Sequence, residues 1–268
     1  MPLGSATALG PARLWRRRPA AADPRPPVLL VHGGYHGAWC WEYWVDRLAA
    51  DGREVAAIDW RGHGGLPPPP DYLQTGALGF TEDVVAAIDA LDRPPVVVGH
   101  SLGGLLAPLA ATRRPTAGLV LVCPSPPGNM PGAAKVPLVP TTEAAPPLSA
   151  AVAGPRYCPH LTEAELAELA GRLCAESPAV LNDRYGLRVP VDPATVRVPV
   201  LVVEGGRDDP ERHPPGQDRA IAEFYGGAHI RLDDAPHNLM LGTGSDRWFD
   251  AIWARLDALL ADAPVAGP

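Results

Sequence analysis

The pentapeptide GHSLG at positions 99–103 constrains this chain more than any other feature, because it directly follows the apolar run PVVV at positions 95–98. Three β-branched residues in a row are typical of a short buried strand in a parallel sheet. The Leu- and Ala-rich segment 102–112 predicts a helix that packs on this strand. Ser101 would then occupy a sharp turn, with glycines on both sides that relieve the crowding. Such a turn holds the hydroxyl above the carboxyl edge of the sheet, beside the positive end of a helix.

The same pattern of glycine and serine also arises by chance in a chain that contains 28 glycines. The alternative interpretation is a glycine-rich connection in which Ser101 has no chemical role. The rest of the chain can decide between the two, because a reactive serine needs a base, an acid that orients the base, and donors for an oxyanion.

Short apolar segments alternate with helical patterns along the chain, which predicts an α/β fold with a mostly parallel, twisted sheet flanked by helices. Strands are expected at residues 28–31, 55–58, 96–98, 119–122, 200–203 and 229–232, with an edge strand at 13–17. Helices are expected at residues 41–50, 81–91, 102–112, 219–224 and 248–260. A chain of 268 residues suits one large domain of this kind.

Residues 124–190 interrupt this alternation, since they begin with a proline-dense stretch and contain no strand pattern. A capping-box sequence at 162–165 predicts the start of an amphipathic helix, and a Ser-Pro pair at 177–178 predicts a second start. A structureless loop of this length is rare in a compact domain. We therefore interpret 124–190 as an inserted helical cap on a core formed by residues 1–123 and 191–268. A linker between two domains is the alternative, but the later residues continue the sheet pattern.

Composition excludes several classes of partner. The net charge of −7 argues against nucleic acid and anionic membranes, and leaves a small-molecule substrate. No apolar run approaches the ~20 residues of a membrane span, and no signal peptide is predicted after the arginines at 16–18. The cysteines lack the spacing of metal ligands, so we expect no metal and a reducing, cytoplasmic location. They are Cys40, Cys123, Cys158 and Cys174. The oligomeric state is left open by the sequence.

His237 is the predicted general base among eight histidines. It lies in the segment DDAPHN at 233–238, between the last predicted strand and the final predicted helix. By contrast, His32 ends a strand, His63 belongs to a turn, and the side chain of His100 is expected to point away from the serine. The remaining histidines lack a loop of this kind. A base at a strand end can reach a serine at the same edge of the sheet.

The predicted acid follows the strand at 200–203, where the sequence continues as EGGRDD. The glycines allow the chain to turn so that a carboxylate reaches back toward the histidine. Asp208 is preferred over Asp209 because of its distance from the strand end. A solvated acidic turn, neutralised by Arg207, is the alternative. The chain order serine, acid, histidine is the order expected when a nucleophilic turn of this type is present.

Two backbone N–H groups are the candidate donors for an oxyanion. The turn at Ser101 presents the N–H of Leu102. The glycine-rich segment HGGY at 32–35 ends another strand, and Gly34 is the expected second donor. A simple tight turn at 32–35 is the alternative.

Five motifs carry a resemblance to the α/β-hydrolase-fold superfamily, over residues 13–260. They are VHGG at 31–34, DWRGHG at 59–64, GHSLG at 99–103, GGRD at 205–208 and PH at 236–237. The segment HGAWCW at 36–41 further resembles the branch of plant esterases and hydroxynitrile lyases. Those lyases carry threonine in place of Gly33 and lysine in place of Asn238, so the resemblance favours a serine esterase.

The residues and the resemblance together predict a serine hydrolase of a carboxylic ester or thioester, with no cofactor. Ser101 would carry the acyl group, His237 would act as base and then as acid, and Asp208 would orient His237. Tyr35, Trp39 and His100 are expected to line the substrate pocket, although the tryptophan also suits ordinary helix packing.

Two other functions remain open at this point. The same fold and residues would serve a lyase, eliminase or cyclase that acts on a natural-product intermediate, with histidine and acid as a proton shuttle. They would also suit a receptor that uses the pocket to bind a ligand.

Overall fold

An eight-stranded sheet forms the centre of the protein, with strand order β1-β2-β4-β3-β5-β6-β7-β8. The computed structural model describes residues 3–21, 23–242 and 244–261. The strands are β1 (Ser5–Leu9), β2 (Ala12–Arg17), β3 (Val28–Val31), β4 (Val55–Asp59), β5 (Val96–His100), β6 (Gly118–Val122), β7 (Val200–Gly205) and β8 (Ala228–Leu232). The pairs β1–β2 and β2–β4 are antiparallel, and the others are parallel. The mostly parallel sheet is therefore confirmed.

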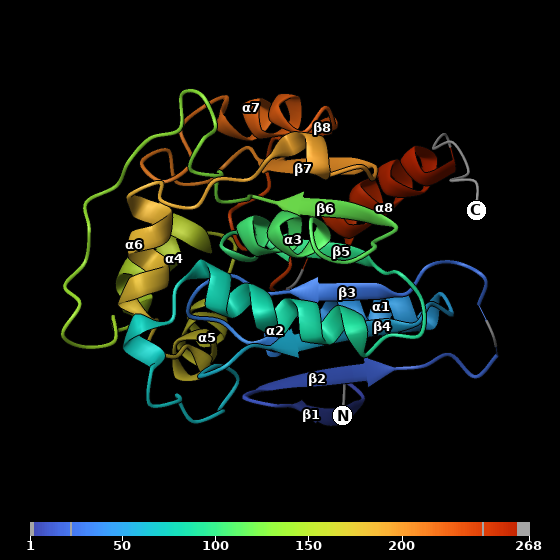
Figure 1. The fold of residues 1–268 in the computed structure, drawn as a ribbon, viewed down its shortest axis with the longest axis horizontal. Helices are drawn as coiled ribbons and strands as arrows, with labels where there is room; N and C mark the ends of the chain where they lie inside the picture. Colours follow the sequence, from blue (N-terminus) through green and yellow to red (C-terminus); the bar gives the residue numbers. More distant parts are fainter. Residues whose placement is uncertain (1–2, 22, 243, 262–268) are drawn as a thin grey trace.

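Helices cover both faces of this sheet (Figure 1). One face carries α2 (Ala77–Asp89), α3 (Gly103–Ala111) and α7 (Gln217–Phe224), and the other carries α1 (Glu42–Ala50) and α8 (Asp246–Ala261). Alternate residues of β3 enter the two cores: Leu29 and Val31 pack on the first, Val28 and Leu30 on the second. Burial on both faces explains why the parallel strands are continuous apolar runs.

Residues 124–190 contain three helices: α4 (Ala150–Tyr157), α5 (Glu163–Arg172) and α6 (Pro178–Tyr185). Figure 1 shows them gathered at the end of the sheet toward which the arrows of β3 and β6 point. The capping box of α5 is formed by Thr162 and Glu165, and Ser177 caps α6 by accepting the N–H of Ala179. These helices therefore lie over the edge where the candidate residues of the strand-end loops gather.

Short 3-10 helices complete the fold of the described residues. They are η1 (Ala38–Trp41), η2 (Tyr72–Gln74) and η3 (Pro193–Thr195). Helix η1 follows the glycine-rich loop at 32–35 along the chain and connects it to α1.

Three elements differ from expectation. Strand β1 was not predicted, because its residues are largely exposed and give no apolar pattern. Helix α4 contains Gly154 and Pro155, which weaken the helical pattern. Helix α2 begins at Ala77 rather than 81, since the carboxylate of Asp183 on α6 accepts the N–H of Ala77 at 2.9 Å. A cap that comes from another element leaves no local signal in the sequence.

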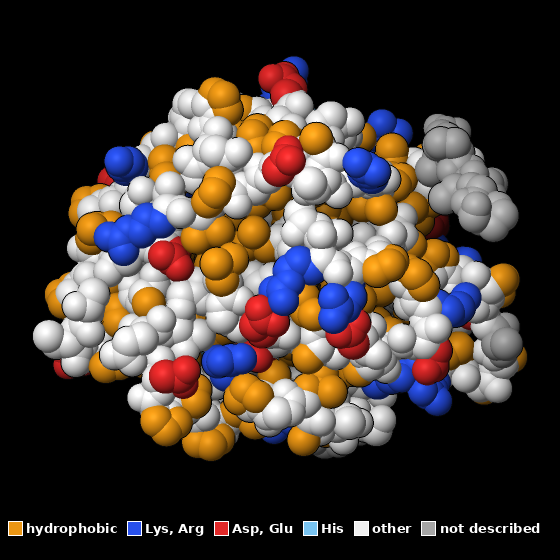
Figure 2. Space-filling view, in the orientation of Figure 1, with side chains coloured by type: hydrophobic (Ala, Val, Ile, Leu, Met, Phe, Trp, Pro, Cys, Tyr) orange, Lys and Arg blue, Asp and Glu red, His pale blue; other side chains and the backbone are white. Residues whose placement is uncertain are grey.

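Basic and acidic side chains are interspersed on the face that α2 and α3 cover (Figure 2). Arg113 pairs with Glu82, and Arg114 pairs with Asp89. A mixed surface of this kind gives no single-sign field for a polyanion. Among the described residues, no helix has the length and apolar character that crossing a membrane requires.

Candidate active site

Ser101 adopts a strained backbone conformation at the turn between β5 and α3. Its φ of 52° lies in the left-handed region, which non-glycine residues rarely occupy. Three hydrogen bonds hold it there: its N–H donates to Val122 O at 3.0 Å, and its carbonyl accepts from Gly104 and Ser125 at 2.9 Å each. The neighbouring strand and the helix start therefore fix the serine at the sheet edge.

The two glycines that flank this turn are required by space. A Cβ at Gly99 would lie 2.3 Å from the carbonyl oxygen of Gly103. A Cβ at Gly103 would lie 2.4 Å from the carbonyl oxygen of His32. Real Cβ atoms do not approach so closely, so any side chain at either position would displace the turn.

His237 forms a hydrogen bond with Asp208, with Nδ1 and Oδ2 2.7 Å apart. Burial alone would raise the pKa of Asp208, but His237 and His213 lower it below the ordinary value of 3.8. The carboxylate is therefore ionised at neutral pH and fixes Nδ1 of His237 as the protonated nitrogen. Asp209, the other candidate acid, instead pairs with Arg156.

His100 contacts His237 through a hydrogen bond and through its ring. Its Nε2 donates to the carbonyl oxygen of His237 at 3.1 Å, and the two rings lie 4.7 Å apart. Burial lowers the pKa of His100 well below its ordinary value, so the ring is neutral.

His213 is a site residue that sequence reasoning missed. Its Nδ1 lies 3.8 Å from Asp208 and 3.7 Å from Asp218, and its ring lies 4.7 Å from that of His237. Burial lowers the pKa of His213, but the two carboxylates raise it above its ordinary value overall. The sequence signal that could have identified His213 is its position five residues after Asp208, in the same loop.

Ser101 and His237 line one cavity, together with Gly34 and Leu102. The N–H groups of Gly34 and Leu102 donate to no other group within the described residues. Two unengaged donors beside a serine are the arrangement that an oxyanion requires. Among the described residues, the hydroxyl of Ser101 forms no hydrogen bond with the ring of His237, whose Nδ1 is bonded to Asp208.

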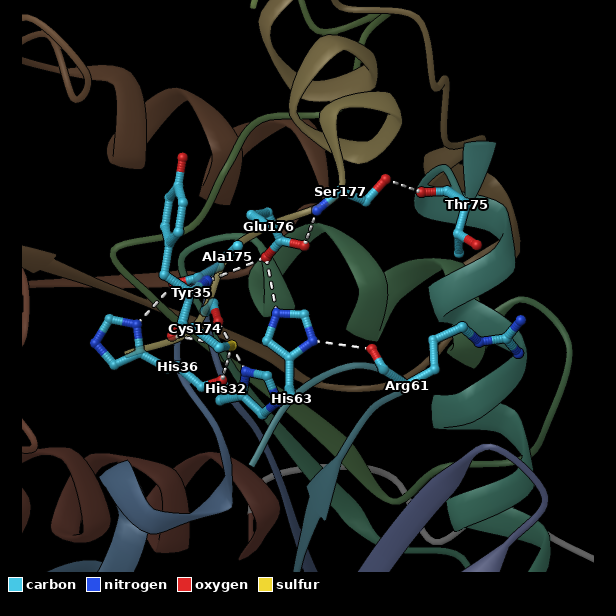
Figure 3. A network of polar contacts seen from close by, with 12 residues as sticks. His32, Tyr35, His36, Arg61, His63, Thr75, Cys174, Ala175, Glu176 and Ser177 are labelled. Carbon is cyan, nitrogen blue, oxygen red and sulfur yellow. Dashed lines mark hydrogen bonds and ion pairs between the residues drawn. The ribbon is translucent and has the colours of Figure 1, made fainter. Parts of the chain in front are cut away.

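A buried carboxylate holds the loop that presents Gly34 (Figure 3). Glu176 is fully buried, and its Oε2 accepts the N–H of Tyr35 at 3.1 Å. Tyr35 itself has a φ of 67°, so this loop is also strained. The carboxylate therefore fastens the strained loop to the segment between α5 and α6.

His63 pairs with the same carboxylate. Its Nε2 lies 3.0 Å from Glu176 Oε2, and its Nδ1 lies 3.0 Å from the carbonyl oxygen of Arg61. Since both partners are acceptors, both ring nitrogens must carry protons, and the ring is an imidazolium. Burial alone would lower the pKa of His63, but Glu176 and Cys174 raise it to about 10.

Two of the three residues expected in the pocket line the cavity, namely Tyr35 and His100. Trp39 is not among the described residues that line this cavity. Its ring stacks on His36 at 5.4 Å, and the guanidinium of Arg172 covers it at 4.7 Å. Trp39 therefore packs between His36, which lines the cavity, and Arg172 of α5, which does not.

One group of described residues has ligand atoms close enough for a metal ion, within 4.8 Å of one another: Cys123, Asp208 and His237. Two of these already form the acid–histidine pair. Burial raises the pKa of the Cys123 thiol well above its ordinary value, so it stays protonated.

Comparison with known proteins gives a consistent family assignment. Residues 28–263 match the model of the alpha/beta hydrolase family. Esterase PIR7B of Oryza sativa subsp. japonica is 40% identical over 101 residues, which are 35% of this chain and 36% of the relative. Methylesterase 9 of Arabidopsis thaliana is 37% identical over 90 residues, 33% of this chain and 35% of the relative. The chain thus spans about a third of the length of these relatives.

The fold agrees with a solved structure over most of the chain. The crystal structure of a methylesterase from Arabidopsis superposes with a TM-score of 0.70 at 16% identity, covering 88% of this chain and 100% of that one. At this identity the likeness shows the fold. Together with the match over residues 28–263, it establishes that this chain belongs to the alpha/beta hydrolase family.

Proposed function

We propose that the protein hydrolyses a carboxylic ester through an acyl-enzyme on Ser101. The 2.7 Å contact between His237 and Asp208 carries this proposal, because it orients a base at the cavity that Ser101 lines. The relatives named esterase and methylesterase support the same chemistry.

In the first half of the reaction, the hydroxyl oxygen of Ser101 attacks the ester carbonyl while Nε2 of His237 takes the hydroxyl proton. Asp208 stabilises the imidazolium that forms. The oxyanion of the tetrahedral intermediate accepts hydrogen bonds from the N–H groups of Gly34 and Leu102. His237 then gives its proton to the departing alkoxide, which leaves as an alcohol.

In the second half, the oxygen of a water molecule attacks the acyl-enzyme while His237 takes a proton from that water. His237 then gives this proton to the oxygen of Ser101 as the acyl group leaves. The products are a carboxylic acid and the regenerated serine. The same steps act on a thioester, with a thiol as the first product.

We also propose that residues 124–190 act as a cap that selects the substrate. Helices α4–α6 contribute Tyr157, Leu169 and Tyr185, among others, to the cavity wall. Substrate choice would then depend on this segment, while the strand-end loops perform the chemistry.

A fluorophosphonate probe tests the proposal, because it reacts with activated serines. We expect labelling of the folded protein at Ser101, located by peptide mass spectrometry, and none in Ser101→Ala. Ser125→Ala is the matched control, since Ser125 lines the same cavity and alanine keeps the backbone N–H that donates to the carbonyl oxygen of Ser101. No labelling of the folded wild type would contradict the proposal.

The two single variants Ser101→Ala and His237→Ala distinguish hydrolysis from elimination or lyase chemistry. An acyl-enzyme needs both groups, so both variants lose ester turnover. A reaction that tolerates loss of the serine but not of the histidine would instead indicate a proton shuttle.

A further inference from the structure

Arg184 is a buried cation that has no carboxylate partner among the described residues, and it lines the same cavity as Ser101. It lies on α6 and is 6% exposed. Its Nη2 lies 3.3 Å from the carbonyl oxygen of Arg212, while Nη1 has no hydrogen-bond partner among the described residues. A residue of the cavity wall therefore carries a guanidinium N–H that is itself buried and lacks an acceptor among the described residues.

A second buried arginine, Arg53, has the carboxylate partner that Arg184 lacks among the described residues. Arg53 is 3% exposed and pairs with Asp257 at 2.6 Å. For Arg184, Asp218 raises the pKa from a distance, but the two form no ion pair in the described part of the chain. An unpaired buried charge is strongly unfavourable, so its presence at a cavity needs a reason.

The charge of Arg184 persists under ordinary conditions. Burial lowers its pKa to about 10, which still leaves the guanidinium protonated at neutral pH. The side chain therefore offers a positive charge and an unengaged donor in an environment where both interact strongly.

A second cation lies at the same cavity. The guanidinium of Arg212 covers the ring of Tyr185 at 4.7 Å and forms no ion pair within the described residues. The wall contains these two arginines and no Asp or Glu among the described residues, although the whole chain has a net charge of −7. The two arginines thus reach this wall while the nearby carboxylates of Asp208 and Glu176 contact His237 and Tyr35, and the arginines are complementary to an anion.

We propose that Arg184 binds a carboxylate of the substrate, so that the protein prefers esters that carry a carboxylate apart from the ester that is cleaved. This inference rests on the proposed ester hydrolysis at Ser101. The two oxygens of a carboxylate match the fork of a guanidinium. Leu148, Leu173 and Leu181 also line the cavity, and they suit an aliphatic chain between the two groups. Half-esters of aliphatic dicarboxylic acids fit this description.

Matched pairs of substrates test the preference. Monomethyl adipate and methyl hexanoate have acyl chains of equal length and differ in a terminal carboxylate. 6-Acetoxyhexanoate and hexyl acetate place the same difference on the alcohol side. We expect kcat/KM to be ~10–100-fold higher for the charged member of at least one pair, as charge-assisted hydrogen bonds imply. Equal or lower kcat/KM for the charged member of both pairs would overturn the proposal.

The variant Arg184→Met assigns the preference to this residue. It removes the charge at similar length, and we expect it to abolish the difference between the charged and neutral esters, mainly through a higher KM for the charged ester. Arg113→Met is the control, because Arg113 lies on the surface and pairs with Glu82. A charged-ester preference that survives Arg184→Met would overturn the assignment.

A binding measurement separates this proposal from the proposed hydrolysis. Monomethyl adipate is titrated calorimetrically into Ser101→Ala and into Ser101→Ala/Arg184→Met. A dissociation constant at least ~10-fold weaker in the double variant supports the carboxylate site, even if no ester is turned over by the wild type. Equal dissociation constants overturn the site, whatever the wild type hydrolyses.

Discussion

Oε2 of Glu176 accepts from Nε2 of His63 at 3.0 Å and from the backbone N–H of Tyr35 at 3.1 Å. One carboxylate thus joins a turn after β4, the loop after β3 and the segment between α5 and α6 (Figure 3). Because Gly34 precedes Tyr35, the position of a candidate oxyanion donor depends on an ion pair outside the serine–histidine–acid set.

Glu176→Gln should lower kcat for ester hydrolysis by ~10–100-fold with a smaller change in KM. The amide loses the charge that holds His63 protonated, and a displaced loop misplaces the Gly34 N–H. Outright loss of an oxyanion donor costs ~10²–10³-fold, so a partial loss is expected here. Glu163→Gln, an exposed change at the start of α5, is the control. An unchanged kcat in Glu176→Gln would contradict this positioning role.

The His63–Glu176 pair should also make stability fall as the pH rises. The pKa of His63 is about 10 in the folded protein against an ordinary value of 6.5. A raised folded pKa means that the stabilisation is complete below about pH 6.5 and is lost as the pH approaches 10. Linkage limits the slope to about 1.4 kcal/mol per pH unit in this window.

Urea unfolding of the wild type and of Glu176→Gln across this pH window measures the effect. We expect the free energy of unfolding of the wild type to fall toward high pH and that of the variant to change less. Parallel pH profiles would show that the pair does not titrate in this range.

Asp208→Asn should lower kcat by about 10⁴-fold, because an amide stabilises the wrong tautomer of the histidine and no imidazolium. Asp209→Asn should change kcat little, since that carboxylate contacts Arg156 instead of His237. Steady-state kinetics of the two variants side by side give the answer. A larger loss in Asp209→Asn would mean that the acid has been misassigned.

Arg184→Met should raise the free energy of unfolding by ~1–3 kcal/mol at neutral pH, because it removes a buried charge that has no carboxylate partner. Arg53→Met is the matched control, and it should not show this gain because the guanidinium of Arg53 is already paired with Asp257. Chemical denaturation of both variants tests the contrast. A destabilised Arg184→Met would indicate that the guanidinium holds the fold together.

Local patterns were sufficient to predict the parallel sheet and the candidate serine, acid and histidine. Ser101 follows β5 and Asp208 follows β7, which are mainly apolar runs with mostly buried side chains. His237 follows β8, whose side chains are only partly buried. The carboxyl ends of parallel strands meet at one edge of the sheet, so order along the chain was enough to bring these residues together.

The residues that sequence reasoning missed depend on contacts between distant segments. Glu176 stands in an unremarkable stretch, and its role appears only when α5 and α6 fold over the loop after β3. The role of Arg184 could not be predicted for the same reason, because its burial without a carboxylate partner among the described residues arises only in the folded protein. The packing of Trp39 against His36 and Arg172 is of the same kind, because no pattern in its own segment predicts either contact.

Trapping of the acyl-enzyme tests the central claim most directly. The wild type is mixed with p-nitrophenyl acetate, quenched in acid within the first turnovers and analysed by intact and peptide mass spectrometry. The proposed mechanism predicts the added mass of one acetyl group on Ser101, and none in Ser101→Ala. Turnover of the ester with no acyl group on Ser101, or with the same acyl group in Ser101→Ala, would contradict the mechanism.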